Sequence, residues 1–208
     1  MITHMMEQGS EAWYAIRCGK VTGTRFKALT MSESTKGYQD LVADIVCEMI
    51  TGKKEDTYSN AIMEKGIETE PIAREMYRSI FEVEVKTVGF ITPDEDHKYA
   101  EWIGISPDGI MPDIKGMIEI KCPLMKTHLR YIECNYLPTD YRHQVQGQLF
   151  VTGFDYCDFM SYSEGMKPFI FRAYPDKILF KEFEDRLDIL INHVKEKLNR
   201  YNKYDYYE

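Results

Sequence analysis

The most regular hydrophobic pattern lies near the end of the chain, where apolar residues recur every three or four positions over 177–200. This spacing places them on one side of an α-helix, so the pattern predicts a long helix with an apolar face in the core. The apolar positions are Phe180, Phe183, Leu187, Leu190, Ile191, Val194 and Leu198.

Upstream, apolar runs and turn residues predict shorter elements. Helices occupy the first part of the chain and are expected again over 60–81, 127–134 and 140–152, with strands near 83–91, 102–105, 110–111, 117–121, 156–162 and 169–173. This mixture indicates an α/β fold with a central mixed β-sheet flanked by helices. We expect one domain over 1–208, whose tyrosine-rich end, 201–208, is either a frayed tail or part of a subunit interface.

The predicted helix over 60–81 carries a glutamate beside a proline. Asn60 is the expected N-cap, and Pro71 predicts a kink or a break next to Glu70. The ordinary role of Glu70 is an ion pair with Arg74, four residues later, which stabilises a helix by only about 0.2–0.5 kcal/mol. A kink beside a carboxylate is more typical of a functional site.

A predicted hairpin brings two acidic residues and a lysine together. Asp108 follows Ser-Pro at the start of a short strand, and Pro-Asp-x-x-Gly at 112–116 predicts a turn that returns the chain. Side chains alternate along a strand, so Glu119 and Lys121 are expected on one face, near Asp108, with the isoleucines beside them in the core.

Two carboxylates and an amine are the side chains that metal-assisted cleavage of a phosphodiester requires. Mg²⁺ binds carboxylates, waters and phosphate oxygens, and Asp108, Glu119 and the carbonyl oxygen of Ile120 can supply protein ligands. Lys121 would orient or deprotonate the attacking water, since a nearby dication and partial burial depress the pKa of a lysine. An ordinary hairpin with a solvated Glu–Lys pair gives the same spacing, and this motif alone does not decide between the two.

Four blocks of sequence strengthen the first interpretation. They are QGSEAWYAIRCGKVTGT at 8–24, GIETEPIAR at 66–74, the segment 106–121 with the following Cys-Pro, and HQVQGQL at 143–149. In content and order these blocks resemble the lambda-exonuclease-like, or YqaJ-type, viral recombination nucleases of the PD-(D/E)XK group. The resemblance implies a restriction-endonuclease-like core.

The resemblance also implies overlapping catalytic and metal-binding sets. The catalytic set is Asp108, Glu119, Lys121, Glu70 and Gln144, and the metal-binding set is Asp108, Glu119, Ile120 and Glu70. Gln144 would donate a hydrogen bond near the scissile phosphate or the lysine. We expect Gln146 and Gln148 to be solvated, and His143 to be structural or to contact phosphate rather than to bind metal.

The first block is implied to hold the terminal 5′-phosphate of duplex DNA through Arg17 and Thr24. A guanidinium can form two parallel hydrogen bonds with phosphate, and a helix beginning near Thr24 offers amide donors. Ser106 and Lys126 are further candidates. Without the resemblance, an exposed Arg17 on an amphipathic helix whose Trp13 packs inward is the simpler interpretation.

Composition narrows the class of protein. The five cysteines form no C-x-x-C pair, so no zinc site, iron–sulfur cluster or disulfide framework is indicated. No run approaches the roughly 18 apolar residues of a membrane span, and the N-terminus lacks the pattern of a secretory signal, so we expect a soluble intracellular protein. The net charge of −8 is unusual for a DNA-binding protein, because neutralising phosphates requires cations.

The activity that the resemblance implies is that of a two-metal, Mg²⁺-dependent exonuclease on double-stranded DNA, with Mn²⁺ as a substitute ion. It would degrade one strand from its 5′ end and leave a 3′ single strand. A ring-shaped homotrimer with a basic lumen would reconcile this activity with the net charge, leaving acidic clusters at 93–96 and 182–185 outside.

The implied partner is a single-strand annealing protein, in the cytoplasm of a bacterial host that carries the phage or prophage. Two other functions remain open from sequence. One is a structure-specific DNA endonuclease of the same superfamily, and the other is a non-catalytic module that binds DNA ends.

Overall fold

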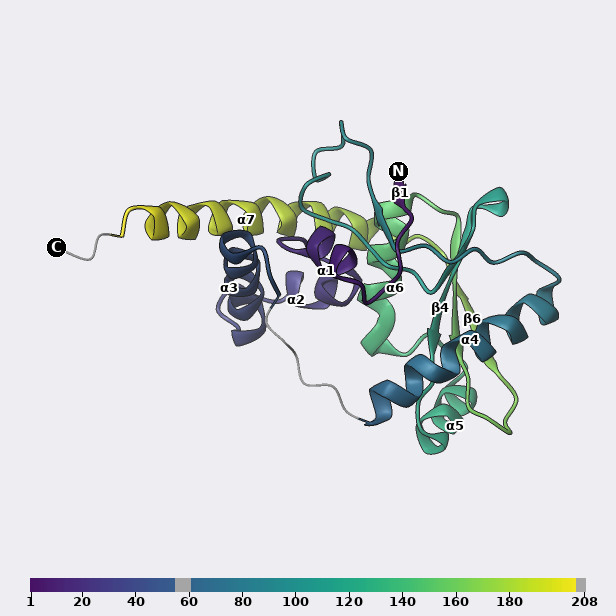
Figure 1. Ribbon diagram of the computed structural model, residues 1–208. Helices are drawn as coiled ribbons and strands as arrows, with labels where there is room; N and C mark the ends of the chain where they lie inside the picture. The colour runs from purple at the N-terminus through teal and green to yellow at the C-terminus, as the bar shows by residue number, and fades with distance from the viewer. Residues whose placement is uncertain (55–60, 205–208) are drawn as a thin grey trace.

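The fold is a mixed β-sheet with helices on both faces (Figure 1). The computed structural model describes residues 1–54 and 61–204, without the side chains of 61–65 and 67. The predicted N-cap Asn60 and the end of the tyrosine-rich stretch therefore lie outside the described residues. Up to that point the stretch is helical through Asn202, and Tyr201 and Tyr204 are exposed.

Four strands form the main sheet in the order β3-β4-β5-β6. Their bounds are β3 Gly109–Met111, β4 Gly116–Lys121, β5 Tyr156–Ser161 and β6 Phe169–Ala173. The β4–β5 pair is parallel and the two outer pairs are antiparallel, which confirms the predicted mixed sheet. A separate antiparallel pair joins β1 (Ile2–His4) to β2 (Phe90–Thr92).

Two predicted strands are shorter or less regular than expected. Of 83–91 only the end enters a strand, β2, although Lys86 forms a single bridge with Ile110. The segment 102–105 forms single bridges through Ile103 and Ile105 rather than a strand. Both isoleucines are fully buried. The apolar run thus correctly predicted burial, but burial does not require a continuous ladder of hydrogen bonds.

The helices follow the predicted order. They are α1 Glu11–Arg17, α2 Phe26–Leu29, α3 Lys36–Thr51, α4 Ala61–Phe81, α5 Met125–Cys134, α6 Thr139–Thr152 and α7 Lys177–Asn202, with 3₁₀ turns η1 at Gly23–Arg25 and η2 at Pro112–Ile114. Asp176 caps α7 by accepting hydrogen bonds from the backbone of Ile178 and Leu179. The far half of α7 extends beyond the sheet beside α3 (Figure 1).

Helix α4 runs through Pro71 without a break, so the predicted interruption is wrong. A proline removes one backbone donor, which tertiary contacts can offset. Here Ala73 and Tyr77, directly after the proline, are buried against Ile118 and Ile120 of β4. This packing holds the helix on the sheet.

The two faces of β4 are covered by different helices. Ile118 and Ile120 face α4, whereas Met117 belongs to the larger core cluster on the side of α6 and α7. Glu119 shares that second face and is only 1% exposed. The alternation of side chains is as predicted, but the solvated Glu–Lys pair of the alternative interpretation is excluded.

A close contact places the N-terminal segment against α6. A Cβ atom on Gly147 of α6 would overlap the ring of Phe26 in α2, so only glycine allows this approach. Gly23 of η1 also lies beside the side chain of Gln144, where a Cβ would be in ordinary contact at 3.4 Å from Cγ. The first and fourth sequence blocks are therefore neighbours in space.

An ion pair with a buried carboxylate joins β5, β6 and α4. Asp158 of β5 is 1% exposed and accepts two hydrogen bonds of 2.8 Å from Arg172 of β6. The hydroxyl of Tyr77 donates to the same carboxylate at 2.6 Å. Burial and this hydrogen bond raise the pKa of Tyr77, so the phenol stays a donor.

We expect Arg172→Met to lower the free energy of unfolding by about 3 kcal/mol, because it leaves a buried carboxylate without its cation. The double variant Arg172→Met/Asp158→Asn should lose less, since the uncompensated charge is gone. Lys181→Met, which removes an exposed pair with Asp185, should cost under about 1 kcal/mol. Urea unfolding measures all three, and additive losses in the double variant would contradict the expectation.

Candidate active site

Asp108 lies at the entrance to β3 and is held from two sides. Its Oδ2 accepts a hydrogen bond of 2.6 Å from the backbone N–H of Ile120. Its backbone carbonyl accepts one of 2.7 Å from Nε of Arg74 in α4. The first contact confirms that the hairpin returns to Asp108, and the second ties α4 to the same point.

Glu119 is surrounded by three donors. Gln144 of α6 donates to its Oε1 at 2.5 Å, and Gln148, one helical turn later, donates to its Oε2 at 2.5 Å. Nζ of Lys121 also lies 2.5 Å from Oε1, which confirms that Glu119 and Lys121 share a face. A carboxylate that is buried to this degree needs such donors.

The glutamines of α6 differ from expectation. Gln148 is 1% exposed and Gln146 is 5% exposed, so neither is solvated. Gln146 instead joins α6 to the backbone of Tyr174 and Asp176. A glutamine in a helix is usually solvated. Nothing in the local sequence indicates that Gln148 lies opposite Glu119, or that Gln146 lies opposite the loop at Tyr174 and Asp176.

His143 fits its predicted structural role. Its ring packs 6.4 Å from that of Phe183, and burial lowers its pKa. Its Nδ1 has no hydrogen-bond partner among the described residues. The ring is therefore a neutral part of the core beside the site.

Burial and nearby negative charge raise the pKa of two carboxylates, Asp108 and Glu70. The pKa of Asp108 is well above its ordinary value because of burial and the nearby charges of Glu119 and Glu70. Burial also raises the pKa of Glu70. Burial lowers the pKa of Lys121, but Glu119 and Asp108 outweigh it, and the net direction is upward. The sequence predicts a lowered pKa for Lys121, whereas the protein groups alone raise it.

Glu70 forms its predicted ion pair and shares a cleft with Asp108. It forms the i,i+4 ion pair with Arg74. It also lines a cleft of about 720 Å³ together with Asp108, Trp13 and Tyr14. Because Arg74 binds the backbone of Asp108 as well, the ion pair belongs to the site and not to a separate surface.

The donor set fits a hard divalent cation. Within residues 1–54 and 61–204 no three His, Cys, Asp or Glu side chains converge into a ready-made metal cluster. Mg²⁺, however, usually takes one or two carboxylates and completes its shell with water and phosphate oxygens. Asp108 and Glu119 supply the carboxylates, and the mutual repulsion that raises the pKa of Asp108 is what a cation would relieve.

A second, smaller hollow of about 170 Å³ adjoins the cleft and shares Trp13 and Tyr14 with it. Its lining is basic and hydroxylic, and comprises Trp13, Tyr14, Arg17, Cys18, Thr22, Thr24, Arg25, Glu48 and Lys54. We call it the basic pocket. The 3₁₀ turn η1 begins at its edge, with Thr22 as N-cap, as the sequence predicted.

Arg17 is fixed at the boundary between the two hollows. Its guanidinium stacks 4.0 Å from the ring centre of Trp13, and Nη1 donates to Oγ of Ser106 at 2.8 Å. Trp13 donates to the same hydroxyl at 2.9 Å. Burial and the nearby Arg25 lower the pKa of Arg17 to about 10, so it remains charged at neutral pH. The interpretation of Arg17 as an exposed surface arginine is wrong.

The sequence did not identify three charged residues of the basic pocket. Arg25 pairs with Glu48, which is 4% exposed and also accepts from the backbone of Gly19 at 2.9 Å. Lys54 lies near Arg17 and Arg25, and burial together with their charges lowers its pKa. Arg25 directly follows Thr24, and this adjacency is a signal that could have placed it in the pocket. Glu48 and Lys54 are distant in sequence from Arg17 and Thr24, so no local signal indicates them.

Lys126 does not join this pocket. It is exposed on α5, which follows β4, packs against β6 and lies at the lower edge of the molecule, away from α1 (Figure 1). Its proximity to Lys121 in sequence is therefore misleading. Arg17, Thr24 and Ser106 are brought together, and Lys126 is not.

Known proteins resemble the chain over most of its length. The YqaJ-like viral recombinase domain matches residues 12–155. An alkaline exonuclease from Laribacter hongkongensis, LHK-Exo, is 33% identical, with 93% of this chain and 97% of that chain covered and a TM-score of 0.82. Its complex with dAMP gives 32% identity, the same coverage and a TM-score of 0.83. The comparison with curated proteins finds no match.

A more distant structure shares the fold alone. A phage-related exonuclease from Haemophilus somnus 129PT is 14% identical, with 87% of this chain and 96% of that chain covered and a TM-score of 0.66. The family match covers residues 12–155, which include Trp13, Arg17 and Thr24, the Asp108 hairpin and the helix that carries Gln144. The chain belongs to the YqaJ-like viral recombinase family.

Proposed function

We propose that the protein is a Mg²⁺-dependent exonuclease that degrades double-stranded DNA from 5′ ends and leaves 3′ single strands for recombination by strand annealing. One observation carries this proposal: a basic pocket adjoins the acidic cleft, and Arg17 of the pocket binds Ser106, two residues before Asp108. The relationship to an alkaline exonuclease supports it.

Each part of the site has a role in the proposal. Arg17, Thr24 and Lys54 bind the terminal phosphate, since the charge of Arg25 is compensated by Glu48. Asp108, Glu119, the carbonyl of Ile120 and Glu70 hold one or two divalent cations, Mg²⁺ or Mn²⁺. When bound, such cations neutralise charge on the phosphate and acidify water.

Lys121 and Gln144 act on the reacting groups. The ammonium of Lys121 lies beside Glu119 and over the ring of Tyr141 at 5.6 Å, so it is directed toward the carboxylates. Its role would be to orient the attacking water, and a cation bound at the carboxylates would supply the positive charge that lowers the pKa of the lysine. Gln144 shares Oε1 of Glu119 with the lysine and positions both.

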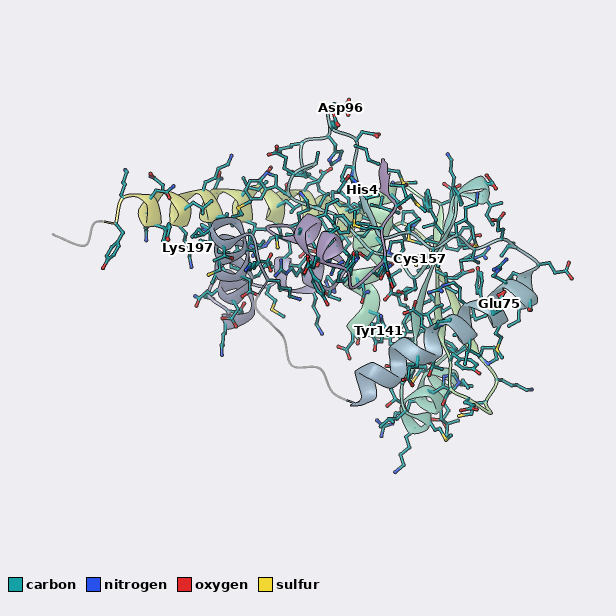
Figure 2. The ribbon with its side chains drawn as sticks, in the orientation of Figure 1. His4, Glu75, Asp96, Tyr141, Cys157 and Lys197 are labelled. Carbon is teal, nitrogen blue, oxygen red and sulfur yellow. The ribbon has the colours of Figure 1, made fainter. Side chains whose placement is uncertain are left out.

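The charge distribution is compatible with a DNA enzyme. Residues 94–96 are exposed, and Asp96 projects from the edge of the molecule in Figure 2, on the loop between β2 and β3 and remote from α4. The cations of the basic pocket are gathered on the other side of Trp13 from the carboxylates. A homotrimeric ring with a basic lumen and an annealing protein as partner, in the cytoplasm of a bacterial host, complete the proposal.

Two other functions predict different results. A structure-specific endonuclease needs no end pocket and would cleave circular DNA. A non-catalytic module would bind DNA ends without cleaving them.

In the described part of the chain no helix is long and apolar enough to cross a membrane.

Digestion of a linear duplex labelled at either end, with and without a 5′-phosphate, tests the activity. We expect Mg²⁺-dependent loss from phosphorylated 5′ ends, none in EDTA and none with Lys121→Ala. Arg17→Ala should reduce the rate on phosphorylated ends about 10- to 100-fold, the effect of losing a charge-assisted hydrogen bond. Lys181→Ala, on the exposed side of α7, is the control for unchanged activity. Cleavage of circular DNA would favour the endonuclease.

A thermal or urea unfolding series tests the cation site without DNA. In EDTA, Asp108→Asn should be more stable than wild type by about 1 kcal/mol, because one of three neighbouring carboxylates is removed. Added Ca²⁺ or Mg²⁺ at a hundred times its Kd should stabilise the wild type by about 2.7 kcal/mol and the variant hardly at all. An equal response of both proteins would place the cation elsewhere.

A further inference from the structure

Gln148 has no role in the proposed reaction, yet it is among the most buried polar residues of the chain. It is 1% exposed, and its amide nitrogen donates to Oε2 of Glu119 at 2.5 Å. On the other side, its amide oxygen accepts a hydrogen bond of 3.7 Å from the thiol of Cys157. Both ends of the amide are therefore engaged, which fixes its orientation.

Cys157 lies on β5, the strand next to the one that carries Glu119. It is fully buried on β5, opposite Met117 of β4. Figure 2 shows it in the interior of the sheet region, away from the surface. Its thiol donates to the amide oxygen of Gln148, so it is linked to the carboxylate of Glu119 through the glutamine.

The two oxygens of Glu119 are in different situations. Oε1 accepts from both Gln144 and Lys121, which uses its two lone pairs. Oε2 accepts from Gln148 alone and retains one lone pair. Without Gln148 the carboxylate of Glu119 could rotate toward Lys121. The free lone pair of Oε2 would then no longer point in one fixed direction.

We propose that Gln148 is a positioning residue that holds Glu119 in the orientation that binds a divalent cation, and that Cys157 fixes Gln148 in turn. This inference rests on the proposed cation site at Asp108 and Glu119. Gln148 touches neither DNA nor cation, and it acts by orienting a ligand. Hydrogen bonds to ligating carboxylates typically change metal affinity 10- to 100-fold.

The chain offers a matched control in Gln146. It lies on the same helix, is 5% exposed, and also uses both ends of its amide, with 2.8 Å contacts to the backbone of Tyr174 and Asp176. It does not contact Glu119. Substituting either glutamine with methionine removes a buried amide of the same size, but only one of the two affects the site.

Isothermal titration of Mg²⁺ and Mn²⁺ into DNA-free protein tests the proposal. We expect Gln148→Met to weaken Mg²⁺ binding about 10- to 100-fold and Gln146→Met to leave it within about twofold. Mn²⁺ affinity should fall less, since Mg²⁺ demands stricter octahedral geometry. Equal Mg²⁺ affinity of Gln148→Met and wild type, at whatever cost in stability, would overturn the inference.

Two further proteins separate the possible failures. Absence of Mg²⁺ binding to wild type, or unchanged binding in Asp108→Asn, would refute the proposed cation site itself. If Gln148→Met does not fold, Cys157→Ala takes its place and should weaken Mg²⁺ binding about 3- to 10-fold, with recovery in Cys157→Ser, which keeps a donor. Wild-type affinity in Cys157→Ala would then contradict the proposal.

Discussion

The burial of one carboxylate, Glu119, constrains much of this structure. A charge that is almost wholly removed from water must be surrounded by donors, and here two of them come from α6 and one from its own strand. The helix must therefore lie across β4 in one register. The contact of Gly147 with Phe26 then carries the constraint to the N-terminal segment, so that the basic pocket has a fixed place relative to the carboxylates.

Two aromatic side chains lie between the carboxylates of the cleft and the cations of the basic pocket. Trp13 and Tyr14 line both hollows, with the carboxylates on one side and the guanidinium and ammonium groups on the other. Glu48 neutralises Arg25 within the basic pocket, and Arg74 partly neutralises Glu70 within the cleft. What remains unneutralised is suited to an anion in the pocket and a cation in the cleft, which are the two kinds of charge that a metal-dependent enzyme acting on a phosphorylated end must hold.

Sequence reasoning succeeded where the information is local or periodic. The apolar repeat of α7, the turn at Pro112–Ile114 and the alternation along β4 all depend on short-range geometry, and each was predicted. The burial of Gln148 and the Arg25–Glu48 pair depend on residues that are brought together only by the fold, and no local pattern signals them. Lys126 shows the converse, since closeness in sequence to Lys121 did not mean closeness in space. Pro71 predicts a kink or a break because the packing of Ala73 and Tyr77 on β4, which holds the helix together, depends on residues distant in sequence.

The attachment of α4 has a consequence for motion. Tyr77 donates to the buried Asp158, and Arg74, almost one turn earlier, donates to the backbone of Asp108. Lifting this helix would remove donors from Asp158 in the sheet and from the backbone of Asp108 in the same event, and would expose Ala73 to water. The middle of α4 therefore opens only when the sheet itself unfolds, and its amide protons should exchange with solvent at the slow rate of global unfolding. The carboxylate of Glu70 is thus carried by a helix that is attached to both the sheet and the Asp108 hairpin.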